Sequence, residues 1–247
     1  MKAIGIIPAR WASTRFPGKI LAPIAGKPML QRVWERVKAA RALSDIIIAC
    51  DEAHVLERAK AFGATAVLTR PDHPSGSDRV AEVAAKTDAD IIVNIQADEP
   101  LIQPGLVDAL VGSLAEADAS CVMATPIKRI AGIEEFRNPN VVKVVTDKKS
   151  FALYFSRAPI PFNRDGVPDT GNYFKHLGLY AYRRAFLFEF CRWPKSFLEQ
   201  QECLEQLRVL EEGFRIKTVE TDMEAMGVDV PEDVVRVETY MKVHGWQ

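Results

Sequence analysis

The stretch AIGIIPARWASTRFPGK, residues 3–19, decides the fold of this chain. It begins with an uninterrupted apolar run, residues 3–7, which is typical of a strand buried on both faces of a parallel sheet. Pro8 ends the run, and a loop rich in arginine, serine and glycine follows. Behind the loop, apolar residues recur at helical spacing from Leu30 to Val37. The pattern therefore predicts a strand, a loop and a helix in that order.

The same alternation continues to the middle of the chain. We predict strands at residues 46–49, 64–68 and 91–95, and helices at residues 55–62 and 79–86. Alternating strands and helices are typical of an α/β fold with right-handed crossovers and a doubly wound, mostly parallel sheet. Ligands bind such sheets beyond the carboxyl ends of the strands. The loops after Ile7 and Ile95 are therefore the first candidates for a ligand site.

From Ala119 onward the pattern changes to short strand-like runs with few long helices between them. The runs are residues 121–124, 141–146, 152–155 and 177–182, and the chain closes with a helix at 203–210, a strand at 215–221 and a helix from Pro231. We interpret residues 120–190 as a mixed-sheet extension of one domain that spans residues 1–247.

Composition excludes several classes of protein. The chain has 247 residues, 48% of them hydrophobic, and a formal charge of -1, which indicates a globular protein with a sizeable core. Balanced charge gives no general reason to bind nucleic acid or a membrane. The first apolar run is too short for a signal peptide or a membrane span. The four cysteines show no zinc or disulfide spacing. We expect a cytoplasmic location.

The loop at residues 8–19 has the composition of a triphosphate site. It places Arg10, Arg15 and Lys19 in one strand-to-helix connection, together with two hydroxyl side chains. Guanidinium groups bind phosphate oxygens in pairs, lysine adds a point charge, and the N–H groups of a turn complete an anion site. The alternative is a solvated basic loop. Neither a Walker A motif nor a Gly-x-Gly-x-x-Gly motif occurs, which argues against P-loop hydrolysis and dinucleotide chemistry.

Two aspartates are candidates for a divalent ion. Asp98 lies at the end of the predicted central strand, and Asp229 precedes the last predicted helix. Mg²⁺ prefers one or two carboxylates together with phosphate oxygens and water. Aspartates in these positions are also typical of turns and helix starts. The segment at residues 69–79 holds small polar residues before a helix, which suits either a nucleoside site or a simple turn with an N-cap.

Several motifs, taken together and in order, resemble a known family from end to end. They are IPAR (7–10), PGK (17–19), HPSG (73–76), QADEP (96–100), ALYFSR (152–157), KHLG (175–178), LEQLR (204–208) and GVD (227–229). This set closely resembles the CMP-Kdo synthetases, or 3-deoxy-manno-octulosonate cytidylyltransferases. Because the motifs occur jointly, the functional interpretation of each outweighs its structural alternative.

The resemblance implies an α/β fold of the nucleotide-diphospho-sugar transferase type, with a small lobe for sugar binding and dimerisation. It implies a homodimer that transfers CMP from CTP to the anomeric hydroxyl of 3-deoxy-D-manno-octulosonate (Kdo) and releases pyrophosphate. It further implies Mg²⁺ as cofactor, with two ions, and a place in lipopolysaccharide biosynthesis.

The resemblance also implies roles for individual residues. The catalytic set is Arg10, Lys19, Asp98 and Asp229, of which Asp98 and Asp229 hold the metal. The residues expected to bind substrate are Ala9, Ser13, Arg15, Ser75, Gly76, Arg79, Gln96, Arg157, His176, Tyr180, Glu205 and Gln206. Ser13 and Arg15 would bind the triphosphate together with Arg10 and Lys19, and Ser75, Gly76 and Arg79 would lie near the nucleoside. Gln96 and the residues from Arg157 onward form the sugar set.

One position departs from the family pattern. Ala97 stands where the family usually has glycine in QGDEP. If that position needs a positive φ, alanine carries a penalty of about 1 kcal/mol. Two alternatives stay open: a cytidylyltransferase for sialic acid or 8-amino-Kdo, and a nucleotide-binding sensor that has lost catalysis.

Overall fold

The computed structural model describes residues 1–166, 169–223 and 226–246. The chain divides into two compact units. The first contains residues 1–108 and 224–247, and the second contains residues 109–223. The expected extension at residues 120–190 falls inside the second unit, whereas the single-domain description stays a prediction. Among the described residues, no helix has the length and apolar character needed to cross a bilayer.

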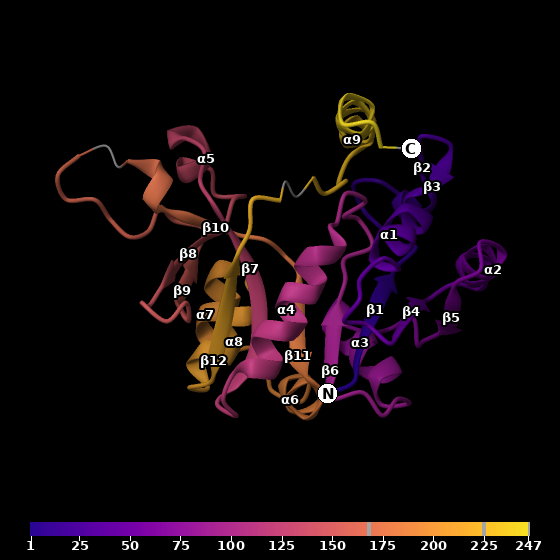
Figure 1. The fold of residues 1–247 in the computed structure, drawn as a ribbon, viewed down its shortest axis with the longest axis horizontal. Coiled ribbons are helices and arrows are strands. Elements are labelled where there is room, and N and C mark those ends of the chain that lie inside the picture. The colour runs from indigo at the N-terminus through magenta and orange to yellow at the C-terminus, as the bar shows by residue number, and fades with distance from the viewer. Residues whose placement is uncertain (167–168, 224–225, 247) are drawn as a thin grey trace. The chain divides into compact units, whose positions relative to one another are not determined.

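The sheet of the first unit is parallel, as the alternation predicts. Strands β5 (Thr65–Leu68), β4 (Asp45–Cys50), β1 (Ala3–Ala9) and β6 (Ile91–Asn94) pair in that order (Figure 1). Every residue of β1 is buried, because the strand is covered on both faces. The register sets Ala9 opposite Cys50. The loops that follow β1 and β4 therefore start at the same edge of the sheet.

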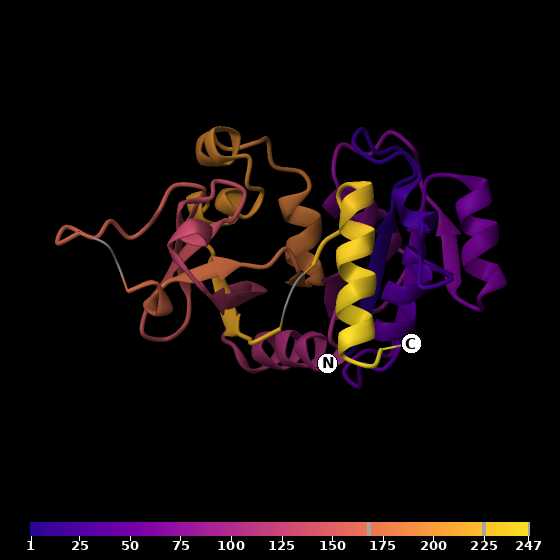
Figure 2. The same ribbon diagram turned by 90° about the horizontal axis from the view of Figure 1, so that it is seen from above.

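Helices of the first unit follow the strands. They are α1 (Met29–Val37), α2 (Ala53–Ala61), α3 (Gly76–Ala84), α9 (Pro231–Val243) and the 3-10 turn η1 (Lys19–Leu21), with the hairpin β2 (Pro23–Ile24) and β3 (Lys27–Pro28). Leu30, Val33 and Val37 of α1 are fully buried, which confirms the helical spacing seen in the sequence. Helix α9, yellow in Figure 2, joins this unit through Glu238, whose Oε1 accepts the N–H of Ala25 at 2.7 Å.

The second unit has a mixed sheet centred on β7 (Cys121–Arg129). Strands β10 (Phe174–His176) and β11 (Tyr180–Arg183) pair antiparallel to β7, β12 (Arg215–Glu220) pairs parallel to it, and β8 (Lys143–Thr146) lies between β10 and β9 (Ala152–Ser156). The helices are α5 (Ile133–Arg137), α6 (Arg184–Phe190), α7 (Phe197–Glu202), α8 (Gln206–Glu211) and the 3-10 turn η2 (Thr170–Asn172); α4 (Pro104–Glu116) contains the boundary between the units.

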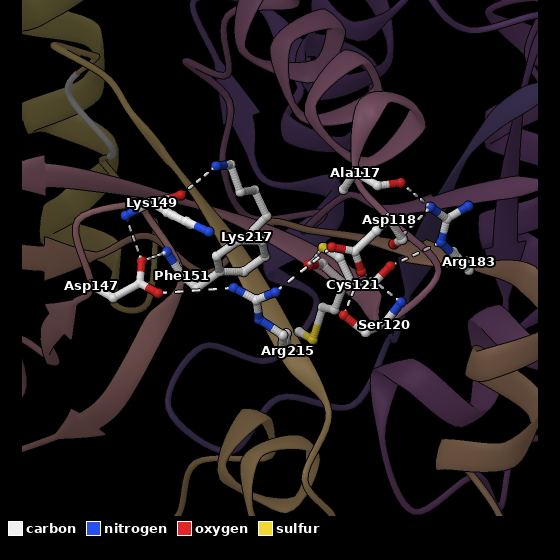
Figure 3. Close-up of polar contacts among 11 residues, drawn as sticks. Ala117, Asp118, Ser120, Cys121, Asp147, Lys149, Phe151, Arg183, Arg215 and Lys217 are labelled. Carbon is white, nitrogen blue, oxygen red and sulfur yellow. Dashed lines mark hydrogen bonds and ion pairs between the residues drawn. The ribbon is translucent and has the colours of Figure 1, made fainter.

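Polar contacts fasten the start of β7 to its neighbours (Figure 3). Arg183 donates from Nε to Cys121 O at 2.9 Å and from Nη2 to Ala117 O at 2.9 Å. Arg215 of β12 lies with its guanidinium carbon 3.4 Å from the centre of the Phe151 ring. These contacts satisfy main-chain carbonyls and stack a cation on an aromatic ring, so they stabilise the sheet.

The expected helix at residues 203–210 is wrong at its start. Cys203 has φ 52°, a left-handed conformation that ends α7. Helix α8 begins only at Gln206. Since a non-glycine residue rarely adopts a left-handed conformation, the sequence carries no signal for this break.

Candidate active site

The loop after β1 closes on itself around Trp11. Gly18 N–H donates to Trp11 O at 3.4 Å, and Lys19 N–H donates to Phe16 O at 3.1 Å. Gly18 has φ 71°, and a Cβ atom at this position would lie 2.7 Å from the Trp11 ring. Glycine alone combines this backbone with so close a ring without strain. The shape of the loop therefore depends on Gly18.

A carboxylate from the neighbouring strand anchors the same loop. Asp51 directly follows β4, and its Oδ1 accepts the N–H of Trp11 at 2.9 Å. Its Oδ2 lies 3.4 Å from Nη2 of Arg79, which is fully buried. Nη1 of Arg79 also donates to Thr69 Oγ1 at 2.5 Å. Asp51 is not among the residues predicted from the sequence, although its position after a predicted strand is the same signal that singles out Asp98.

Asp51→Ala is expected to raise the KM for CTP, the nucleotide that the resemblance implies, about tenfold and to lower the melting temperature. Trp11 N–H loses its acceptor, and a buried Arg79 loses its counter-charge, a change that costs about 3–5 kcal/mol in proteins. Steady-state kinetics and thermal melting measure both effects. Asp45→Ala, at the exposed start of the same strand, is the matched control. An unchanged KM for CTP would contradict the anchoring role.

A cavity of about 410 Å³ opens between this loop and the ends of the strands. Its lining residues are Pro8, Arg10, Ala12, Ser13, Thr14, Arg15, Lys19, Ile20, Gly76, Gln96, Ala97, Asp98 and Asp229. The structure thus brings together all four residues of the expected catalytic set and most of the expected triphosphate set. Ala9 is buried at the end of β1, where it supports the loop. The cavity is concave, polar and basic on one side, as a polyphosphate requires.

Lys19 lies between the two candidate metal ligands. Its Nζ donates to Asp98 Oδ2 at 2.6 Å, to Asp229 Oδ1 at 3.1 Å and to Val228 O at 3.1 Å. Burial disfavours the charge on Lys19, but the attraction of Asp98 and Asp229 outweighs it and raises the pKa of Lys19 above its usual value. The lysine is therefore protonated at neutral pH. Arg15 adds a second contact, with Nη2 3.1 Å from Asp229 Oδ2.

Asp98 and Asp229 fit the requirements of a magnesium site. Both carboxylates reach one cationic group, Lys19 Nζ, so both can approach a single bound cation. Among the described residues, no group of three or more histidine, cysteine or acidic side chains is arranged around a metal position. Two carboxylates match an ion that takes its other ligands from phosphates and water. Beside them, burial and the charges of Asp98 and Asp229 raise the pKa of Glu99 to about 8.

The residues expected at the nucleoside divide between two positions. Gly76 lines the cavity, where its lack of a side chain leaves room. Ser75 is the N-cap of α3: its Oγ accepts the N–H of Asp78 at 3.2 Å and donates to Asp78 Oδ2 at 2.7 Å. Arg79 points into the interior. Their contacts with a nucleoside stay predictions, and the N-cap alternative holds for Ser75.

Ala97 has no unusual backbone. Among the described residues, the non-glycine positions with positive φ are Ala25, Ser150 and Cys203. Ala97 is buried and lines the cavity beside Asp98. The penalty considered for a positive φ at this position therefore does not apply.

The second unit gathers most of the expected sugar set. The rings of His176 and Tyr180 lie 5.4 Å apart, and Tyr180 Oη donates to Gln206 Oε1 at 3.3 Å. Nε2 of Gln206 is buried without a hydrogen-bond partner among the described residues. Glu205 directly precedes α8. These side chains form a polar group with an aromatic wall, which suits a hydroxylated ligand.

Arg157 is held by contacts with Glu202 and Pro139. Its Nε donates to Glu202 O at 2.7 Å and its Nη1 to Pro139 O at 3.1 Å. Its own N–H donates to Glu202 Oε2 at 2.8 Å. These contacts fix the guanidinium plane. They also match the structural alternative, in which Arg157 only ties the chain together.

Burial lowers the pKa of His176 from 6.5 to about 3. The unfolded chain therefore takes up a proton at this histidine near pH 6.5, which the folded chain takes up only near pH 3. The contribution of neutral His176 to the free energy of unfolding is fully present above pH 6.5. It falls as the pH drops toward 3, with a slope of up to about 1.4 kcal/mol per pH unit. His176→Asn is expected to flatten the loss of thermal stability between pH 6.5 and 4. Parallel melting curves for the two proteins would contradict this.

Comparison with known proteins identifies the family. Residues 4–219 match the family model described as cytidylyltransferase. A 3-deoxy-manno-octulosonate cytidylyltransferase of Geotalea daltonii is 50% identical over 254 residues, covering 99% of this chain and 100% of the relative. The enzyme of that name from Solibacter usitatus is 55% identical over 241 residues, covering 98% and 95%.

A solved structure agrees with these relatives. The structure of a CMP:2-keto-3-deoxy-manno-octonic acid synthetase complexed with CTP superposes with a TM-score of 0.93 at 41% identity, over 99% of this chain and 100% of that chain. This agreement confirms the expected α/β fold with a mixed, mostly parallel sheet and flanking helices. The chain belongs to the cytidylyltransferase family, among the 3-deoxy-manno-octulosonate cytidylyltransferases.

Proposed function

We propose that this enzyme transfers CMP from CTP to the anomeric hydroxyl of Kdo and releases pyrophosphate. The observation that carries the proposal is the cavity after β1, where three cations and two carboxylates meet at the carboxyl ends of parallel strands. The solved relative with the same fold was complexed with CTP. Its name and those of the curated relatives specify the acceptor sugar.

The chemical step is a displacement at phosphorus. The anomeric oxygen forms a bond to the α-phosphorus, the bond from that phosphorus to the bridging oxygen of the β-phosphate breaks, and the hydroxyl proton passes to bulk water. Arg10, Arg15 and Lys19 stabilise the negative charge that grows on the leaving pyrophosphate. Main-chain hydrogen bonds within the loop hold its backbone before CTP arrives, which limits how far the loop backbone must reorganise on binding.

We propose that Asp98 and Asp229 hold magnesium when CTP is bound. When bound, the metal would neutralise charge at the phosphates and would lower the pKa of the attacking hydroxyl. Asp229 is the more accessible carboxylate, with 50% of its side chain exposed against 31% for Asp98. Lys19 contacts both carboxylates in this structure and would be a cation available to the phosphates of CTP once the metal is bound.

The acceptor and the reaction are tested together by magnesium-dependent pyrophosphate release from CTP. Kdo, 8-amino-Kdo, sialic acid and a no-sugar control form the arms of the experiment. Release with Kdo alone is the expected result. Release with only another sugar overturns the acceptor and leaves the transfer reaction standing. CTP binding without release in any arm supports the sensor alternative.

We also propose a homodimer in the cytoplasm that supplies lipopolysaccharide synthesis. The family resemblance supports the dimer, which light scattering at several concentrations tests. All four cysteines are free, and two of them, Cys50 and Cys121, are buried, which suits a reducing compartment. Loss of CMP-Kdo and of lipopolysaccharide in a cell depleted of this protein tests the pathway.

A further inference from the structure

The ring of His176 has aromatic neighbours and a single polar partner among the described residues. Phe155 packs edge-on against it with ring centres 5.1 Å apart, and Tyr180 lies 5.4 Å away. The polar partner is Thr125 of β7, whose Oγ1 lies 2.9 Å from His176 Nε2. Thr125 is fully buried.

The hydroxyl of Thr125 has two further neighbours, and both are main-chain carbonyls. Leu179 O lies 2.8 Å from Oγ1 and Leu177 O lies 3.3 Å from it. A carbonyl oxygen can only accept a hydrogen bond, whereas a threonine hydroxyl has one hydrogen to donate. That hydrogen therefore goes to a carbonyl. If it went to His176 instead, two oxygen lone pairs would face each other at the 2.8 Å separation from Leu179.

The position of that hydrogen fixes the proton on the imidazole. With its hydrogen on a carbonyl, Thr125 Oγ1 offers only a lone pair to His176, so Nε2 must carry the N–H of the ring. The other nitrogen, Nδ1, is then an acceptor. In the part of the chain that the structure describes, Nδ1 has no hydrogen-bond partner, and the side chain is only partly buried.

We propose that Thr125 is a positioning residue for the acceptor sugar, because it holds His176 in the Nε2–H tautomer and so presents Nδ1 as an acceptor for a sugar hydroxyl. This inference rests on the proposed function. A neutral acceptor suits a hydroxyl and rejects a carboxylate, which has no hydrogen to donate. The low pKa of His176, caused by burial, agrees with a neutral ring. The carboxylate of the sugar acid must then bind elsewhere.

The tautomer is measured first, on the full chain without substrate. In ¹⁵N–¹H correlation spectra of the imidazole groups at pH 7.5, with His176→Asn to assign the signals, His176 is expected to show a protonated Nε2 and an unprotonated Nδ1. Thr125→Val, which keeps the shape and removes the hydroxyl, is expected to give a mixture of tautomers. Thr125→Ser, which keeps the hydroxyl, is expected to give the wild-type pattern. A protonated Nδ1 in the wild-type enzyme overturns the proposal.

Kinetics then connect the tautomer to the sugar. Thr125→Val is expected to raise the KM for Kdo about three- to tenfold, the effect of one neutral hydrogen bond, while the KM for CTP stays within twofold of wild type. Thr125→Ser is expected to restore the KM for Kdo. An unchanged KM for Kdo in Thr125→Val, or an equal rise in both KM values, overturns the positioning role.

The two proposals fail in different ways. If the wild-type enzyme uses a different sugar acid, the Kdo assignment falls, and the same comparison of KM values is made with that sugar. If Thr125→Val does not fold, the wild-type tautomer and Thr125→Ser still decide: a protonated Nδ1, or a changed tautomer in Thr125→Ser, overturns the inference. The spectroscopic result is independent of turnover.

Discussion

Asp98→Asn is expected to reduce magnesium-dependent pyrophosphate release at saturating CTP and Kdo by about 10²- to 10³-fold. The substitution keeps the size of the side chain and removes its charge. Asp98 Oδ2 is 2.6 Å from Lys19 Nζ, so the neutral amide weakens the strongest contact of that lysine. It also removes one of the two carboxylates proposed to hold the metal. The negative charge of the reacting phosphates would then be neutralised less well.

The fold is expected to survive this change, because Asp98 is partly exposed at the end of a loop that the main chain already holds. Asp98 O accepts the N–H of Val228 at 3.0 Å whatever the side chain. Circular dichroism and thermal melting check this. Binding of Mn²⁺ in the presence of CTP is expected to weaken at least about tenfold. Asp88→Asn is the matched control, since this exposed carboxylate precedes β6, at the opposite end of the strand. Near-normal turnover in Asp98→Asn would remove Asp98 from the catalytic set.

The strands of the first unit could be predicted because burial on both faces requires continuous apolar runs. Residues 3–7, 46–49 and 91–95 each carry such a run, and each corresponds to a strand of the parallel sheet. Helix α4 was not predicted. Its sequence, PGLVDALVGSLAE, contains two glycines and apolar residues on more than one face, so its amphipathic signal is weak.

The phosphate loop could be predicted in composition but not in shape. Three cations between a strand and a helix identify the ligand class from sequence alone. The closure of the loop depends on Trp11 N–H and on Asp51, which is 40 residues away along the chain. Such a contact has no local pattern, because it arises only when β1 and β4 pair in parallel with their ends level.

The residues expected to bind the sugar were also predictable only in part from the sequence. His176 and Gln206 belong to motifs that resemble those of the family, so sequence comparison finds them. Thr125 lies in the strand-like run that continues from residues 121–124, where a buried threonine is unremarkable. Its role depends on two carbonyls, those of Leu177 and Leu179, that reach it from a later segment. Only the folded chain shows that the hydroxyl of Thr125 donates its hydrogen to a main-chain carbonyl.

Lys19→Met is expected to lower kcat/KM for CTP by about 10²- to 10³-fold, the effect of removing one preorganised charged donor from a phosphate site. Methionine keeps the length of the side chain, so the loss is mainly one of charge. In the free enzyme, Lys19 Nζ contacts Asp98 Oδ2 and Asp229 Oδ1 at 2.6 and 3.1 Å. Without the ammonium group these carboxylates repel each other, and the triphosphate loses a cation.

Metal binding in the absence of CTP distinguishes two roles of Lys19, its contact with the carboxylates and its contact with the phosphates of CTP. If Asp98 and Asp229 hold the metal, then Lys19 competes with it when no CTP is present, and Lys19→Met is expected to bind Mn²⁺ more tightly than wild type does. Lys19→Arg is the control: it keeps the charge, but a planar guanidinium cannot reproduce the point contacts of an ammonium, so only part of the activity is expected to return. Weaker Mn²⁺ binding in Lys19→Met would mean that the lysine orients the carboxylates for the metal rather than competing with the metal for them. Tighter binding together with lost turnover would assign Lys19 to the phosphates of CTP.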